Sequence, residues 1–381
     1  MTSTSFNRRQ WLKSGALAAA GLTFGKSTWN TAEAATTRKQ MLSDLPVIKA
    51  RLSANENPFG PSEKARKAII DAIPESFLYP RQQLMEFRKM IAQEEGVSED
   101  HVLLGAGSGE LLVATGMCYT FKGGAGSHVV SGDPSYMQLI RAATQIGCGW
   151  EKVPLNAKYD YDLEAMAARV SDKTSLVYVC NPNNPTGVLT DPGKLAAFCE
   201  TVSPKKPVFV DEAYIDYVGD PKKNSMVPAI LKGHNVIVAR TFSKVHSFAG
   251  LRIGYLIAKP DTIREINKFG GGGSSISATS VRGALASYGD KEFIKYSVGK
   301  NREAKEFLYK TLRDNGYEYL PSETNFVLFP IKMDGKRFVE EMGKRGVSIR
   351  NWEFEGKHWC RVSMGTMDQM KMFADAFKAL A

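Results

Sequence analysis

The stretch NVIVARTFSKVHSFAGLRIGY, residues 235–255, combines two features that decide the fold. Its first half is a continuous apolar run rich in β-branched residues, which is typical of a strand buried on both faces. Its second half places Lys244 just after that run and Arg252 further on, among glycines. A lysine at the end of a buried strand is either a solvated loop residue or an amine kept for chemistry. The rest of the chain has to decide between these readings.

Similar apolar runs recur from about residue 100 and alternate with helical patterns. The predicted strands are HVLLGAG (101–107), SHVVSG (127–132), LVYVCN (176–181), PVFVDEAY (207–214), NVIVARTF (235–242) and GYLIAKP (254–260). The predicted helices between them include residues 109–121, 135–147 and 191–202. Continuous apolar strands separated by helices indicate an α/β fold, with a mostly parallel sheet flanked by helices on both faces.

The C-terminal part has a different pattern. After the glycine-rich FGGGGSSIS (269–277), a long helical region runs to about residue 315. Three strand-like runs follow, NFVLFPI (325–331), VSIRNW (347–352) and WCRVSMG (359–365), and predict a smaller α+β C-terminal domain. The GGGG segment is either a linker or a loop beside a site.

We therefore expect four segments: a leader over 1–34, an N-terminal arm over 35–75, a large domain over 76–275 and a small domain over 276–381. Within the arm, Pro61 and Ser62 begin an amphipathic helical stretch that runs to Ile73.

The leader resembles a twin-arginine (Tat) export signal. Arg8 and Arg9 precede an apolar run of about a dozen residues, which is too short to span a bilayer, and AEA follows at 32–34. We expect cleavage after Ala34 and export, for example to the periplasm. An amphipathic helix at the start of a cytoplasmic protein is the alternative.

Composition and residue spacing give no support for nucleic-acid binding or for a metal site. The 381 residues carry a formal charge of +10 that is spread along the chain, without a nucleic-acid motif, so the charge suggests solubility and anionic substrates. No C-x-x-C pair or other metal-ligand spacing occurs among the five cysteines, which are Cys118, Cys148, Cys180, Cys199 and Cys360.

Polar residues, glycines and prolines gather at the ends of five of the predicted strands, in GAGSGE, GDPSY, NPNNPTG, DEAY and TFSK. Ligands of such sheets bind beyond the carboxyl ends of the strands, so we expect one site there. The main-chain N–H groups of Ser108 and Gly109, at the start of a helix, could hold a phosphate. A tight turn alone would also explain the glycines of GAGSGE, and it is the simpler interpretation. Thr241, Ser243 and Arg252 could contact the same phosphate.

Four further side chains complete the expected site. Asp211 ends a buried run and needs a cationic or hydrogen-bonding partner, although it could form a structural ion pair. Tyr214 offers a phenol, and Asn184 an amide in a proline-fixed turn. Tyr136 offers a ring face, although such a tyrosine is usually half-buried packing. With Lys244, these groups are the set that pyridoxal 5′-phosphate (PLP) requires, which includes an amine for its aldehyde and an anion for its ring nitrogen.

From RLSANENPFGPS to CRVSMGTMDQMKMFADAF, the chain resembles the histidinol-phosphate aminotransferase group of fold-type I PLP enzymes. NPNNPTG, VDEAY and TFSK…AGLRIGY, in this order and spacing, carry the resemblance. It implies Lys244 as the Schiff-base lysine, Asp211 on the pyridine nitrogen, Asn184 and Tyr214 on the ring hydroxyl, and Tyr136 stacked on the ring. It also implies that the phosphate is held by Ser108, Gly109, Thr241, Ser243 and Arg252.

The resemblance implies further residues for the partner subunit and the substrate. Tyr79, in FLYP, would reach the phosphate of the neighbouring subunit of a homodimer. Arg361, in CRVSMG, matches the arginine that grips the substrate anion, and Arg350 lies near it. Asn57, in NENP, lies on the arm that lines the pocket. The implied reaction moves an amino group between an L-amino acid and a 2-oxo acid, without a metal.

The chain departs from this group around the pocket. Val245, His246, Ser247 and Phe248 replace the usual residues after the lysine, and Ala106 stands where an asparagine is often found. His246 could be a loop spacer, a hydrogen-bond partner or a proton carrier. Because histidine biosynthesis is cytoplasmic and the leader predicts export, we expect an aromatic or basic α-amino acid as donor. A PLP-dependent decarboxylase or lyase, and a non-catalytic exported binding protein, are the alternatives.

Overall fold

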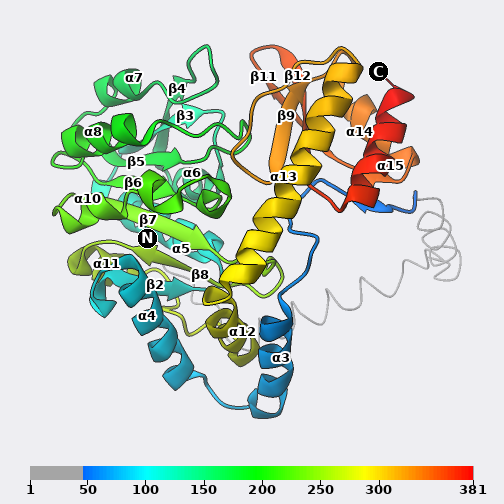
Figure 1. Ribbon diagram of the computed structural model, residues 1–381. Coiled ribbons are helices and arrows are strands. Elements are labelled where there is room, and N and C mark those ends of the chain that lie inside the picture. Colours follow the sequence, from blue (N-terminus) through cyan, green and yellow to red (C-terminus); the bar gives the residue numbers. More distant parts are fainter. Residues whose placement is uncertain (1–45, 381) are drawn as a thin grey trace, which may run out of the picture. The chain divides into compact units, whose positions relative to one another are not determined.

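The computed structural model describes residues 46–380. The predicted leader and the first part of the predicted arm lie outside the described residues. The central feature is a seven-stranded sheet (Figure 1), whose strands in spatial order are β2 (Val102–Gly105), β8 (Gly254–Ile257), β7 (Val236–Thr241), β6 (Val208–Asp211), β5 (Thr174–Cys180), β3 (His128–Asp133) and β4 (Gly149–Pro154). Strand β8 runs opposite to the other six strands, which are parallel to one another. The prediction of a mostly parallel sheet is therefore confirmed.

Helices cover both faces of this sheet because alternate strand residues point to opposite faces. Val236 and Val238 of β7 share a buried cluster with Leu195, whereas Ile237 belongs to the cluster that contains Leu111. The helices of this part of the chain are α3 (Glu63–Ala72), α4 (Arg81–Glu95), α5 (Ser108–Gly123), α6 (Gln138–Gln145), α7 (Leu163–Ala168), α8 (Pro192–Val202), α9 (Pro221–Asn224), α10 (Val227–Leu231), α11 (Pro260–Asn267) and α12 (Ala278–Tyr288), with 3₁₀ turns η1 (Ile73–Glu75), η2 (Glu99–His101) and η3 (Ile215–Tyr217).

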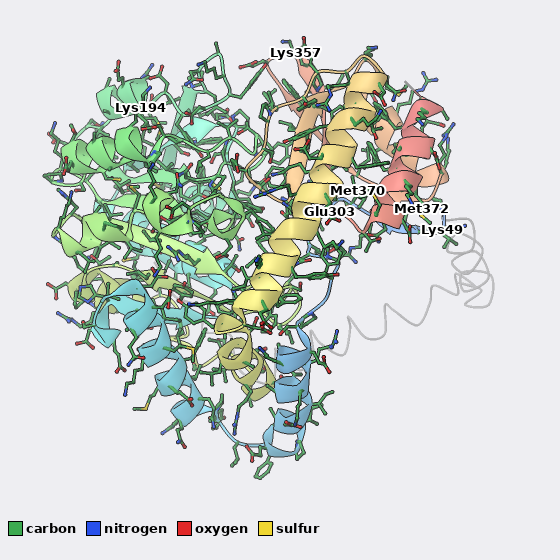
Figure 2. All side chains as sticks on the ribbon, in the orientation of Figure 1. Lys49, Lys194, Glu303, Lys357, Met370 and Met372 are labelled. Atoms are coloured by element: carbon green, nitrogen blue, oxygen red, sulfur yellow. The ribbon has the colours of Figure 1, made fainter. Side chains whose placement is uncertain are left out.

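The C-terminal part forms a second core around a small sheet, as predicted. Its antiparallel strands are β11 (Arg350–Phe354), β12 (Lys357–Ser363) and β9 (Phe326–Pro330) in spatial order, and its helices are α13 (Lys291–Asp314), α14 (Gly335–Lys344) and α15 (Met367–Lys378). On α15, Met370 is buried in this core whereas Met372 is exposed (Figure 2).

The described part of the arm contacts both cores. The short strand β1 (Ala50–Arg51) pairs with β10 (Val347–Ser348), and Leu52 lies in the small-domain core. Ala65 of α3 belongs instead to the core of the large sheet, as do residues of α12. The domain boundaries that the sequence suggests stay predictions.

Two local features follow from capping. Ser62 caps α3, because its hydroxyl accepts the N–H of Ala65. The long helical region predicted after residue 277 is divided in two at Gly289 and Asp290, where a glycine and an N-cap aspartate end α12 and begin α13.

No helix of the described residues combines the length and the apolar character that a membrane crossing requires.

Candidate active site

A cavity of about 270 Å³ opens where the strands of the large sheet end. Register places these ends side by side, because Cys180 of β5 pairs with Asp211 of β6, which pairs with Ala239 of β7. The cavity is lined by Ala54, Asn55, Ser108, Gly109, Tyr136, Gln138, Cys180, Asn184, Asp211, Ala213, Tyr214, Thr241, Ser243, Lys244, Ala249, Arg252, Arg350 and Arg361. The structure therefore brings together every side chain that the sequence suggested for this site except Tyr79 and Asn57.

One end of the cavity is built to hold an anion. Ser108 and Gly109 begin α5, so their main-chain N–H groups lack partners within the helix. Arg252 donates to the hydroxyl of Ser243 at 3.3 Å, and Thr241 donates to the same hydroxyl at 3.0 Å. Gly107 has a φ of 79°, and a Cβ there would collide with the guanidinium of Arg252. A phosphate fits this cradle of N–H, hydroxyl and guanidinium donors.

Asp211 presents a buried carboxylate to the same cavity. Its side chain is 1% exposed, and its oxygens accept only the Tyr178 hydroxyl at 3.2 Å and the Ala213 N–H at 3.2 Å. Burial raises the pKa of Asp211 to about 6, because the charged form loses water without gaining an adjacent ion-pair partner. A protonated ring nitrogen would supply that partner.

A phenol and two amides also meet in this cavity. The Tyr214 hydroxyl oxygen accepts the Asn55 amide at 2.9 Å and the Asn184 amide at 3.4 Å. Burial raises the pKa of Tyr214, so the phenol keeps its proton. Because a phenol oxygen has two lone pairs, two donated N–H groups leave its own O–H free to donate into the cavity.

The amine of Lys244 lies beside this phenol. Its Nζ donates to the main-chain carbonyl of Asn55 at 3.1 Å and lies 5.3 Å from the ring centre of Tyr214. Burial lowers the pKa of Lys244 to about 8, and the nearby Arg361 contributes to this lowering, whereas Asp211 acts in the opposite direction. An amine with this pKa is partly neutral near pH 7, so it can attack a carbonyl and move protons.

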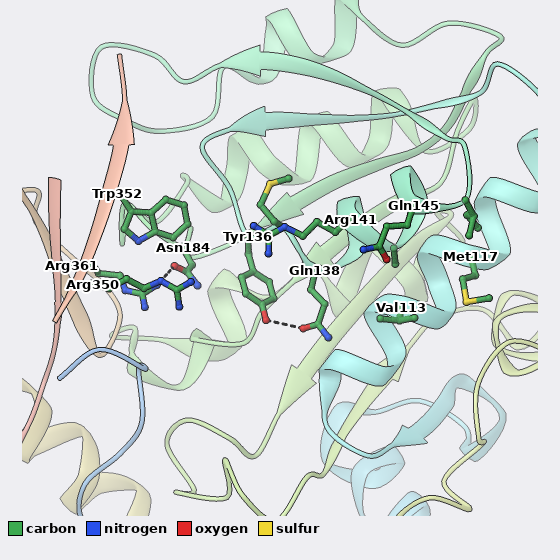
Figure 3. A pocket seen from close by; sticks show the side chains of 13 residues that line it. Val113, Met117, Tyr136, Gln138, Arg141, Gln145, Asn184, Arg350, Trp352 and Arg361 are labelled. Carbon is green, nitrogen blue, oxygen red and sulfur yellow. Dashed lines mark hydrogen bonds between the residues drawn. The ribbon is translucent and has the colours of Figure 1, made fainter. Parts of the chain in front are cut away.

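Tyr136 is half-buried, and its hydroxyl donates to the side-chain oxygen of Gln138 at 2.8 Å (Figure 3). Gln138 also donates to the Gly109 carbonyl at 3.1 Å, and a Cβ at Gly109 would lie 2.7 Å from its amide nitrogen. Gln138 thus ties the tyrosine ring to the anion cradle. Gln138 could not be singled out from the sequence, since a glutamine at the start of a helix carries no signal of its own.

Arg361 is 4% exposed although it carries a charge. It donates to the Asn184 side-chain oxygen at 2.7 Å and to the Ser53 carbonyl at 3.0 Å, and its Nε has no partner among the described residues. Burial lowers the pKa of Arg361 to about 10. Arg350 faces it across the β11–β12 pair and is exposed.

A second cavity of about 460 Å³ shares five of these residues and extends between α5 and α6 (Figure 3). The shared residues are Tyr136, Gln138, Asn184, Arg350 and Arg361. Its other lining residues are Val113, Met117, Met137, Arg141, Ala142, Gln145, Ile146 and Trp352.

Two residues suggested by the sequence lie away from the cavity. The Asn57 amide donates to the Val245 carbonyl at 2.8 Å and to the Ser297 hydroxyl at 3.1 Å, so it ties the arm to the lysine loop and α13. Asn55, two positions earlier, lines the cavity instead. Nothing local to NENP distinguishes the two asparagines. Tyr79 is 86% exposed, and no residue of the described chain fixes its side chain by a hydrogen bond.

The structure also shows the contacts of His246 and of the GGGG segment. His246 is buried, stacks on Phe242 with ring centres 4.2 Å apart, and shares a hydrogen bond with Ser287. Burial lowers the pKa of His246 to about 3, which leaves it neutral.

Glu110 accepts the N–H of Gly271 at 2.8 Å and that of Ala106 at 2.6 Å. The GGGG segment is therefore a loop tied to the anion cradle.

Metal ligands do not gather in the described residues, where no group of three or more His, Cys, Asp or Glu side chains could hold an ion. All five cysteines are buried and free.

The residues of the first cavity fit PLP on structural grounds. The cradle suits its phosphate, Asp211 lacks an adjacent cation, and Lys244 has a lowered pKa. The alternative of a non-catalytic binding protein is disfavoured by an amine tuned for attack.

Comparisons with known proteins agree with this geometry. The family described as "Aminotransferase class I and II" matches residues 47–377. The histidinol-phosphate aminotransferase of Moorella thermoacetica is 34% identical over 332 residues, which cover 87% of this chain and 85% of that protein.

Solved structures show the same fold. Histidinol-phosphate aminotransferase from Sinorhizobium meliloti, in complex with PLP, superposes with a TM-score of 0.79 at 28% identity, and the match covers 88% of this chain and 92% of that one. The L-threonine-O-3-phosphate decarboxylase of Porphyromonas gingivalis shares the fold at 20% identity and a TM-score of 0.73, covering 87% and 98%. The family match over most of the chain, together with a lysine, a carboxylate and an anion cradle in one cavity, places the protein among the class I and II aminotransferases, which are PLP-dependent transaminases.

Proposed function

We propose that the amino donor is an L-amino acid with a large apolar or aromatic side chain, whose α-carboxylate binds Arg361. The observation that carries this proposal is the guanidinium itself. It is buried in the same cavity as Lys244, and its partners, the Asn184 and Ser53 oxygens, are both neutral. A buried guanidinium with neutral partners is a strong site for a carboxylate, which accepts two parallel N–H bonds.

The second cavity supports the choice of side chain. Val113, Met117, Ile146 and Trp352 offer apolar surface, and no carboxylate lines it. Arg141 and Arg350 disfavour a cationic side chain, so a basic donor fits less well than an aromatic one. Both guanidinium groups belong to exposed residues and can stay hydrated while an apolar side chain enters.

The chain's own residues then have defined tasks. Bound PLP supplies an electron sink for the amino acid's Cα. When PLP is bound, Asp211 would hold its ring nitrogen, Tyr214 and Asn184 would hold its ring hydroxyl, and Tyr136 would cover one face of the ring. Lys244 removes the proton from Cα, because its amine is the neutral base that the cavity provides near pH 8.

Arg361→Lys tests the substrate site. Lysine keeps the charge but loses the planar pair of donors, so we expect amino acid binding to weaken by about 1.5–3 kcal/mol, the range for hydrogen bonds to charged groups. Cofactor content and the cofactor's absorption spectrum should be unchanged, because the phosphate cradle is separate. Dissociation constants for phenylalanine, lysine, aspartate and histidinol phosphate, measured through that spectrum, check both the site and the donor class.

Two results would refute this proposal in different ways. A variant with a lower melting temperature and unaltered affinity for every donor would make Arg361 a structural residue only. A wild-type protein that binds histidinol phosphate or lysine at least tenfold more tightly than phenylalanine would reject the apolar donor.

We also propose a homodimer. The surface over α3, η1 and α4 exposes a group of large apolar side chains, which in a monomer would face water. They are Ile70, Ile73, Phe77, Leu78, Tyr79 and Met85. A second copy of the chain would bury them and bring Tyr79 to the neighbouring phosphate site. A molar mass of one chain, measured by light scattering on the holoenzyme at micromolar concentration, would contradict the dimer.

The leader supports a further proposal, export through the twin-arginine route. Arg8→Lys combined with Arg9→Lys should leave an active enzyme in the cytoplasm, because the change keeps both charges and removes only the guanidinium pair. Fractionation followed by activity assay checks this, and the exported protein should begin near Ala35. Equal export of the two forms would show that the leader is not read in this way.

A further inference from the structure

We propose that Asn55 is a positioning residue of the active site, which holds the free amine of Lys244 with its main-chain carbonyl and directs the O–H of Tyr214 with its side-chain amide. The inference rests on the cofactor site and is independent of the donor's identity. Neither role was visible in the sequence, where Asn55 is one of two asparagines in NENP.

The main chain at Asn55 has the rare left-handed conformation. Its φ is 52°, a region that glycine, asparagine and aspartate tolerate best. In this conformation the Asn55 carbonyl accepts both Lys244 Nζ and the Asn325 amide, each at 3.1 Å. The residue is 2% exposed, so these contacts are largely shielded from bulk water. The carbonyl is thus a fixed acceptor for the amine whenever the lysine is not joined to the cofactor.

The side chain of Asn55 is oriented by Ser363 of β12. The Ser363 hydroxyl accepts the Asn55 main-chain N–H at 2.7 Å and donates to the Asn55 side-chain oxygen at 2.9 Å. With the Ser363 proton donated to the side-chain oxygen of Asn55, that oxygen is the acceptor end of the amide. The NH₂ end must then face Tyr214, to which it donates at 2.9 Å.

The contact with Tyr214 decides where the phenol proton points. Asn55 and Asn184 both donate to the Tyr214 oxygen, so the O–H is left to donate into the cavity. A phenol that donates to the ring hydroxyl of PLP stabilises the deprotonated form of that group. Asn55 therefore acts on the cofactor through Tyr214, from the arm that also packs in the small-domain core.

Asn55→Asp is the sharpest test, because aspartate keeps the size and the left-handed preference while it replaces the amide donor by an acceptor. The Tyr214 O–H should then turn to the new carboxylate. We expect the pH midpoint of the cofactor's absorption change to rise by about one pH unit, since the deprotonated form loses its donor. Asn55→Gly keeps the main-chain carbonyl and removes the amide, so it should give a smaller rise.

A double-mutant cycle shows whether the effect passes through the phenol. In a Tyr214→Phe background, Asn55→Gly should leave the midpoint unchanged, because no O–H remains to be directed. The same background also reports direct charge effects of Asn55→Asp. The other groups that face Lys244 and Tyr214 stay the same in every variant, and they are Glu56 of the arm, Tyr136, Cys180, Asp211, Arg252 and Arg361.

The contact between the Asn55 carbonyl and the amine of Lys244 can be tested separately in the apoprotein. Ser363→Ala removes the two hydrogen bonds that orient Asn55 without altering any residue that lines the cavity. It should raise the rate at which an amine-specific acylating reagent modifies Lys244, located by peptide mass. Midpoints for Asn55→Asp and Asn55→Gly within 0.2 pH units (~0.3 kcal/mol) of the wild type would overturn the phenol assignment. An unchanged rate of Lys244 modification would overturn the amine assignment.

Discussion

Replacing Lys244 by alanine is expected to lower turnover of an L-amino acid by at least about a thousandfold, within the range of 10²–10⁴ for a positioned acid or base. The reason is that no other neutral amine lies in the cavity, and the pKa of about 8 suits Lys244 to move the Cα proton. The variant should still bind PLP through the cradle of Ser108, Ser243 and Arg252, which the substitution does not touch.

A second buried lysine provides the control. Lys305 is 9% exposed and donates to the Ser322 and Thr324 carbonyls, away from the cavity. Lys305→Ala should lower stability and leave turnover of the folded enzyme near that of the wild type. If Lys244→Ala kept its turnover within about tenfold, a barrier change of only about 1.4 kcal/mol, the role assigned to Lys244 would be wrong.

Asp211→Asn should have the next largest effect, a loss of about 10²–10³ in turnover, which is typical when one preorganised electrostatic partner is removed. The amide is isosteric but carries no charge, so it cannot keep a ring nitrogen protonated. Measured kcat and cofactor content separate a slower reaction from a lost cofactor.

The same substitution should stabilise the apoprotein above pH 6. In the folded chain the pKa of Asp211 is about 6, above the ordinary value of 3.8, so the folded state binds more protons between these pH values. Stability from this group is therefore present below pH 4 and lost as the pH rises through 6, at a cost of roughly 3 kcal/mol. The uncharged amide of the variant would not carry that cost.

Urea unfolding of both apoproteins at pH 4 and pH 7 checks this sign. The wild type should lose stability relative to Asp211→Asn between the two pH values. An Asp211→Asn apoprotein that is less stable at pH 7, with turnover unchanged, would show that Asp211 is a structural acceptor rather than the cofactor's anion.

Much of the site could be predicted because its residues follow buried strands. Asp211 and Thr241 end β6 and β7, and parallel register alone brings such ends to one edge of a sheet. The apolar runs indicated the strands, and hence the fold class, without knowledge of any contact.

The features of the site that the sequence could not predict depend on contacts between distant parts of the chain. Asn55 meets Ser363 across 308 positions and Lys244 across 189, and no local pattern reports such pairs. Gln138 acts through Tyr136 and Gly109, which a helix signal cannot reveal. The sequence of the GGGG segment fits a linker and a loop equally well, and only the hydrogen bond from Gly271 to Glu110 distinguishes the two.

The fold alone leaves the reaction open, since a decarboxylase shares it. Transamination is supported by the match to the aminotransferase family and its relatives. Lys244 and Arg361 line one cavity, where we propose that they take the Cα proton and hold the α-carboxylate.

The most direct measurement is a single turnover of the holoenzyme with phenylalanine and no oxo acid. For a transaminase we expect one molecule of the 2-oxo acid per active site, with the nitrogen kept on the cofactor and no carbon dioxide. The starting spectrum should return when a 2-oxo acid is added. Release of carbon dioxide and an amine, or continued turnover without an acceptor, would contradict transamination.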